Sequence, residues 1–78
     1  MEFLKIGDQE IEVLELWESE KARLYRRLDD DTIAWIPHTA LTKLYFNVYR
    51  RTSKRIVKAW YSEKINWKQN TIQTWYSK

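Results

Sequence analysis

The absence of cysteine and the presence of only one histidine limit the ways in which the fold of this chain can be stabilised. Neither a disulfide nor a zinc site built from cysteine and histidine can hold the 78 residues together. A chain of this length is expected to form one domain, and so small a domain buries only about 60% of its unfolded surface. The five Trp, five Tyr and two Phe residues must therefore supply much of the core. We expect residues 1–78 to form a single domain.

The chain carries no sign of secretion or of membrane insertion. Residues 1–6 include an early acid, and no long apolar run follows them, which is unlike a signal peptide. No apolar stretch approaches the roughly 20 residues that a membrane-spanning helix needs. The lack of cysteine fits a reducing compartment. We therefore expect a soluble, cytoplasmic protein that has no membrane partner.

The charges are distributed unevenly, although the net charge is only +3. Residues 1–20 contain seven acidic side chains and one lysine, whereas residues 21–78 contain 13 basic side chains and four acidic ones. Basic clustering of this kind favours an anionic partner. Attraction between the acidic and basic parts within the fold explains the pattern equally well, so both interpretations stay open.

Alternating apolar and polar residues predict a fold built mainly from short strands. The expected strands are residues 2–6, 9–17, 21–28, 32–36 and 43–51. A change of apolar parity indicates a bulge between Val13 and Leu14, and Pro37 should end the fourth strand. One helical turn is expected at residues 38–41 and a helix at 54–65, with a strand as the second choice for 54–65. The sequence thus favours a small α+β domain with a strongly bent antiparallel sheet of four or five strands, partly closed like a barrel.

The same alternation predicts which side chains form the core. In residues 43–51, Leu44 shares one face with Phe46 and Val48, and we assign that face to the core. Trp17 also lies in a strongly apolar context. The residues expected to be buried together are Leu24, Leu28, Trp35, Phe46, Val48 and Trp60.

Residues that could support catalysis do not form a recognisable group. His38 is the only histidine, and no Ser-His-Asp or Cys-His spacing surrounds it, so we interpret it as a surface or turn residue. Asp29, Asp30 and Asp31 are consecutive and cannot all point at one cation from an extended segment. With Gly7 as the only glycine, a glycine-rich phosphate loop is excluded. We predict a protein that is not an enzyme and that uses no cofactor or metal.

Aromatic residues alternate with basic ones on two of the predicted strands, and period-two spacing places each set on one side of its strand. Cations that follow phosphates, combined with rings that stack on bases, are typical of proteins that bind single-stranded nucleic acid. The residues predicted to bind nucleic acid are Arg23, Tyr25, Arg27, Lys43, Tyr45, Tyr49 and Arg51. Two alternatives remain: ordinary Tyr–Arg pairing on an exposed sheet face, or burial of the tyrosines beneath the late helix.

Two tryptophans in polar surroundings favour a second class of function. Trp67 and Trp75 lie in the polar C-terminal segment, and tryptophan is enriched at the energetic centres of protein interfaces. Together with Tyr76, they predict a protein-interaction module, either a homodimer or an adaptor for a larger partner.

The stretch from Lys21-Ala22 to Trp35-Ile36-Pro37 resembles a group of short, uncharacterised bacterial and phage proteins. In that group, a strand that opens with Lys-Ala leads to an acidic turn and to a strand that ends in Trp-Ile-Pro. A helix with a Trp shortly before a Lys follows, and Trp60 and Lys64 correspond to that pair here. The resemblance covers about half of the chain.

This chain departs from the pattern of that group at two places. The group usually has a Ser shortly after the Pro and a Pro just before the helix Trp, where this chain has His38-Thr39 and Lys58-Ala59. The second departure affects the expected start of the helix. The resemblance implies a phage or mobile-element context, in which a short protein that binds and inhibits a larger host complex would fit.

Overall fold

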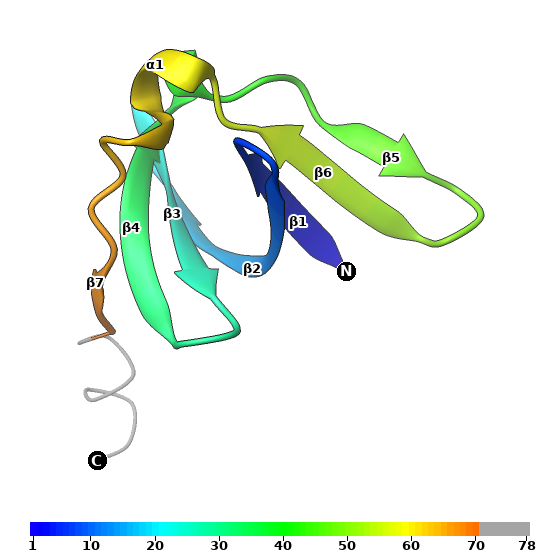
Figure 1. The fold of residues 1–78 in the computed structure, drawn as a ribbon, viewed down its shortest axis with the longest axis horizontal. Helices are drawn as coiled ribbons and strands as arrows, with labels where there is room; N and C mark the ends of the chain where they lie inside the picture. The colour runs from blue at the N-terminus through cyan, green and yellow to red at the C-terminus, as the bar shows by residue number, and fades with distance from the viewer. Residues whose placement is uncertain (71–78) are drawn as a thin grey trace.

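The computed structural model describes residues 1–70, and strands make up most of this part of the chain (Figure 1). The strands are β1 (Glu2–Ile6), β2 (Gln9–Glu18), β3 (Ala22–Arg27), β4 (Thr32–Pro37), β5 (Tyr45–Asn47), β6 (Thr52–Ile56) and β7 (Lys68–Gln69). A 3-10 helix at His38–Ala40 follows β4, and the short helix α1 (Ala59–Ser62) follows β6. This composition is consistent with the predicted α+β class.

All seven strands of residues 1–70 belong to one sheet, in the order β5-β6-β1-β2-β3-β4-β7. Every neighbouring pair is antiparallel except β1 and β6, which are parallel. The sheet is not closed, because β5 and β7 lie at opposite ends of the strand order. The predicted barrel of four or five strands is therefore wrong, and an open, mostly antiparallel sheet of seven strands takes its place.

The first four strands form a meander whose turns the sequence indicates clearly. Gly7, at a φ of 61°, begins the two-residue loop between β1 and β2, a conformation that glycine adopts without strain. Asp30 accepts hydrogen bonds from the backbone and hydroxyl of Thr32 and so shapes the turn between β3 and β4. The predicted bulge lies between Glu15 and Trp17 rather than between Val13 and Leu14.

The second half of the chain differs more from the prediction. Residues 43–51 do not form one long strand, because β5 has three residues and residues 48–51 turn the chain back into β6. Residues 54–65 do not form a helix of that length, because Thr52–Ile56 pairs with β1 and only Ala59–Ser62 is α-helical. The strand given as second choice therefore describes residues 54–56.

The core lies on one face of the curved sheet. Leu4, Val13, Tyr25 and Ile36 come from four neighbouring strands, and all four side chains are buried. Leu41 and Val57, which form an isolated bridge to each other, extend the core at one end of the sheet. The β5–β6 hairpin extends away from β3 and β4 (Figure 1).

The predicted core is wrong for most of its members, because the chain buries the other face of the sheet. Leu24 is buried, and the strand register places it between Trp17 and Trp35. α1 has only four residues, and its Tyr61 packs against the core cluster. The residues assigned to the core that are in fact exposed are Trp17, Leu28, Trp35, Leu44, Phe46, Val48 and Trp60.

Candidate nucleic-acid interface

The loop of the β5–β6 hairpin has a conformation that local interactions determine. The side-chain oxygen of Asn47 accepts hydrogen bonds from the backbone N–H groups of Tyr49 and Arg50, both at 3.1 Å. This arrangement lets a short polar side chain replace a backbone partner in a tight turn. Asn47 and Thr52 are paired across the hairpin, so residues 48–51 form its tip. The tip is thus a defined structure that carries Tyr49, Arg50 and Arg51.

Arg51 occupies a backbone conformation that few residues adopt. Its φ is 54°, in the left-handed region, where a side chain costs about 1 kcal/mol or more relative to glycine. Glycine would fit this position without strain, but the chain has an arginine there. The tip therefore carries a cation at a site where backbone geometry alone would favour glycine, and strained positions of this kind cluster at functional sites.

The aromatic side chains of the hairpin are largely exposed. Tyr49 is 96% exposed, Phe46 is 62% exposed, and Tyr45 is also exposed. These rings gain little from burial in this position, so the fold does not explain why they are large and apolar. Contiguous exposed apolar side chains of this kind mark interaction sites.

The cations of the hairpin have few partners within the part of the chain that the structure describes. Lys43, Arg50 and Arg51 form no ion pair with any of residues 1–70. The Nζ atom of Lys43 lies 5.5 Å from the centre of the Tyr45 ring. Lys54 forms one ion pair, with Glu10, at 3.1 Å between Nζ and Oε1. We call the following set the hairpin surface: Lys43, Tyr45, Phe46, Tyr49, Arg50, Arg51 and Lys54.

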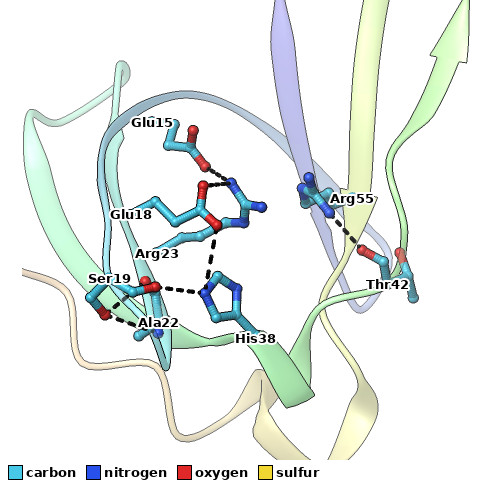
Figure 2. Close-up of polar contacts among 8 residues, drawn as sticks. All are labelled: Glu15, Glu18, Ser19, Ala22, Arg23, His38, Thr42 and Arg55. Carbon is cyan, nitrogen blue, oxygen red and sulfur yellow. Dashed lines mark hydrogen bonds and ion pairs between the residues drawn. The ribbon is translucent and has the colours of Figure 1, made fainter.

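The cations of β3, in contrast, are neutralised within the fold. Arg23 forms ion pairs with Glu15 and, at 3.2 Å, with Glu18 (Figure 2). Arg27 contacts Asp29 at 2.7 Å, and this hydrogen bond lowers the pKa of Asp29 and raises that of Arg27. The two predicted strand faces therefore do not form one surface, since the charges of β3 serve internal contacts.

Tyr25 lies in the core and not on an exposed face, so its predicted position is wrong. It is fully buried, and the face of β3 that it shares with Arg23 is the core face. Its hydroxyl group has no hydrogen-bond partner among residues 1–70. Burial raises the pKa of Tyr25 to about 12, and the nearby carboxylate of Glu2 adds to the effect.

We expect Tyr25→Phe to change the pH dependence of stability more than stability itself. At pH 7 the variant should be about as stable as the original protein, because the lost hydroxyl makes no hydrogen bond among residues 1–70. Above a pH of 10, the unfolded tyrosine loses its proton before the folded one, whose pKa is about 12. The original protein should therefore lose stability between these values, and the variant should lose less. Urea unfolding at pH 7 and pH 11 measures both effects. A large loss of stability of the variant at pH 7 would contradict the expectation that the two proteins are about equally stable at that pH.

Polar contacts near His38 connect the turn after β2 to the end of β4 (Figure 2). The Nε2 atom of His38 lies 2.9 Å from the carbonyl oxygen of Ser19 and 3.9 Å from Glu18. The Ser19 hydroxyl donates to the carbonyl oxygen of Ala22 and accepts from its N–H group, both at 3.1 Å. His38 thus has the position of a turn residue that links two strand ends.

The predicted protein-interface residues fall in different parts of the chain. Trp67 is partly buried against the core, and the guanidinium carbon of Arg27 lies 5.2 Å from its ring. Trp75 and Tyr76 lie outside the described residues. Among residues 1–70 the exposed tryptophans are instead Trp60, in α1, and Trp17 and Trp35, on the outer face of β2 and β4.

Four residues of this region were not selected from the sequence. The sequence pattern does not single out Phe3, Arg50 or Lys54, and it places Phe46 in the core because Phe46 alternates with polar residues. An open hollow of about 430 Å³ at the base of the hairpin brings these four side chains together. One signal could have indicated the region: residues 32–62 contain no Asp or Glu.

Comparisons with known proteins identify no relative of this chain. No family model matches it, and neither a curated protein nor a solved structure matches it. Among residues 1–70, the structure contains no helix of the length and apolar character needed to span a membrane. The same residues contain no group of three or more His, Asp and Glu side chains that could hold a metal ion.

Proposed function

We propose that this protein is a non-enzymatic module that binds nucleic acid, in single-stranded form, through the hairpin surface. The observation that carries the proposal is a group of cations that form no ion pair with residues 1–70, beside exposed rings at one projecting hairpin. Lys43, Arg50 and Arg51 form no ion pair with residues 1–70, and Tyr49 is 96% exposed next to them.

The distribution of charge supports this choice of surface. The acidic first part of the chain neutralises Arg23 of β3 through Glu15 and Glu18, and the aspartates of the following turn neutralise the other two arginines of β3. It does little to neutralise the hairpin, where Glu10 pairs with Lys54 alone. An anionic partner is therefore attracted to the hairpin more strongly than to β3. Exposed rings distinguish nucleic acid from other polyanions, because bases stack on them.

The salt dependence of binding tests the proposal. If three or four cations contact phosphates, the logarithm of affinity should fall with the logarithm of salt at a slope of about −2 to −3 for a single strand. Affinity should then drop about 20- to 50-fold between 50 and 200 mM salt. Fluorescence anisotropy with labelled DNA and RNA strands measures the slope. The proposal fails if neither nucleic acid binds at 50 mM salt.

A second candidate function is association with a protein, including a second copy of this chain, through the outer face. Trp17 and Trp35 are exposed on either side of Leu24, and exposed tryptophans of this kind favour an interface. Self-association should make the melting temperature depend on concentration, because binding stabilises the folded state by mass action. Trp35→Ala should remove that dependence, and a melting temperature independent of concentration in the original protein excludes a homodimer.

A further inference from the structure

The hollow at the base of the β5–β6 hairpin combines rings, cations and hydrogen-bonding groups in one place. Its volume of about 430 Å³ is in the range of small-ligand sites. It is open to solvent and is bounded by the four neighbouring strands β5, β6, β1 and β2 and by the hairpin tip. The residues that line it are Phe3, Glu10, Tyr45, Phe46, Asn47, Arg50, Thr52 and Lys54.

The strand register explains why two of these rings line the same hollow. Lys54 of β6 pairs with Tyr45 of β5 on one side and with Phe3 of β1 on the other. Paired residues of neighbouring strands point to the same face, so Tyr45, Lys54 and Phe3 form one row across the sheet. This row depends on the parallel pairing of β1 with β6, which joins residues about 50 positions apart.

The polar groups of the hollow match the edge of a nucleobase. The Asn47 side-chain oxygen is used by the backbone of the tip, whereas its Nδ2 donors form no hydrogen bond with residues 1–70. Glu10 presents a carboxylate that forms an ion pair with Lys54 at 3.1 Å and can accept a hydrogen bond from a ligand. A donor and an acceptor beside aromatic walls are what an unstacked base requires.

We infer that this hollow binds one unpaired nucleobase of a nucleic-acid strand whose phosphates contact Arg50 and Arg51. The inference rests on the proposed function and adds to it a defined pocket for the base. A paired base is stacked within its duplex and cannot enter such a hollow, so the pocket selects unpaired nucleotides. Phe3, which lies in β1 and not in the hairpin, becomes part of the binding site.

The direct test compares strands that differ only in their bases. A thymidine dodecamer and an abasic dodecamer carry the same phosphates, so contacts to phosphate contribute equally to both. We expect the thymidine strand to bind about 5- to 150-fold more tightly, the range for stacking one base on an aromatic side chain. Equal affinities would overturn the base pocket and leave the proposed function intact, whereas no binding of either strand at 50 mM salt would overturn both.

A variant outside the hairpin separates the pocket from stacking at the tip. Phe3→Leu removes a ring of the hollow with a small change of volume, and Trp35→Leu removes an exposed ring on β4 as the matched control. We expect Phe3→Leu to lower affinity for the thymidine strand at least 5-fold and to leave affinity for the abasic strand unchanged. Trp35→Leu should leave the affinity for both strands unchanged. A thymidine mononucleotide that binds as tightly as the dodecamer would overturn a role in strand binding.

Thermal unfolding of both variants establishes that they are folded at the temperature of the binding assay. If Phe3→Leu is too unstable to measure, Tyr45→Leu provides the same comparison, because Tyr45 is exposed and its ring lies in the same row. Unchanged affinity of the folded variant for the thymidine strand would overturn the pocket.

Discussion

Replacing Ile36 by alanine should lower the free energy of unfolding by about 2–5 kcal/mol. Ile36 is fully buried and packs with Leu4, Val13 and Tyr25, so its loss leaves a cavity that these side chains cannot fill without moving. A domain of this size has only about 5–15 kcal/mol of stability, and the lower part of that range is expected here. Urea unfolding at pH 7 should show a much lower midpoint or a protein that is already unfolded.

Trp60→Ala is the informative comparison. Trp60 is 53% exposed and belongs to the four-residue helix α1, where its ring meets Tyr61 edge to face at 5.5 Å between centroids. Losing that ring pair should cost about 1 kcal/mol. The sequence pattern places Trp60 in the core and predicts a loss of about 3–5 kcal/mol. A cost for Trp60→Ala as large as that for Ile36→Ala would contradict the core described by the structure.

The first four strands could be predicted because their signals are local. Alternation within residues 2–6 and 21–28, and turn residues such as Gly7 and Asp30, act over a few positions. β6 could not be predicted in the same way, because its partner is β1 at the other end of the chain. Four-residue spacing of apolar side chains in residues 54–65 favoured a helix, and the distant strand pairing overrides that local preference.

The choice of the buried face could not be read from alternation alone. Tyr25 and Leu24 are neighbours on opposite faces of β3, and both are buried. The core face contains Tyr25 with Ile36, and the outer face contains Leu24 with the large but exposed Trp35. Alternation separates two faces of a strand but does not show which of them another segment covers. The large size of Trp35 favours the wrong face as the buried one, because a large apolar side chain can also lie exposed.

Only part of the candidate site could be predicted from the sequence, because spacing does not show which cations are neutralised by nearby carboxylates. Tyr45, Tyr49 and Arg51 do lie in one hairpin, although Tyr49 and Arg51 are in its loop and not in a strand, and Lys43 lies just before the hairpin. Arg23 and Arg27 have the same spacing, but nearby carboxylates neutralise them. The two interpretations of the uneven charge therefore apply to different parts of the chain: internal attraction at β3, and unneutralised cations in the hairpin.

Removing the two arginines at the hairpin tip should weaken nucleic-acid binding by about 100-fold at 50 mM salt. The estimate takes about tenfold for each charged hydrogen bond to phosphate. The double variant Arg50→Ala/Arg51→Gly should also reduce the magnitude of the salt slope by about 1.4, since each lost phosphate contact accounts for about 0.7 with single strands. Anisotropy titrations across a range of salt concentrations measure both quantities on the same samples.

The choice of glycine at position 51 separates binding from stability. Arg51 has a φ of 54°, a conformation that glycine adopts without strain, so Arg51→Gly alone should leave the melting temperature unchanged or raise it. A loss of affinity in a protein that is equally or more stable cannot be attributed to unfolding. A clear fall in the melting temperature would instead show that the arginine side chain supports the tip.

A second double variant controls for net charge. Arg26→Ala/Arg27→Ala also lowers the net charge from +3 to +1 by removing two arginines, but these two pair with Asp31 and Asp29 in the fold. If the hairpin surface binds phosphates, this variant should keep its salt slope and most of its affinity, because the removed cations were already neutralised. Equal losses in the two double variants would mean that overall charge, and not the geometry of the hairpin, attracts the nucleic acid. A difference of tenfold or more between them would locate the interface at residues 50 and 51.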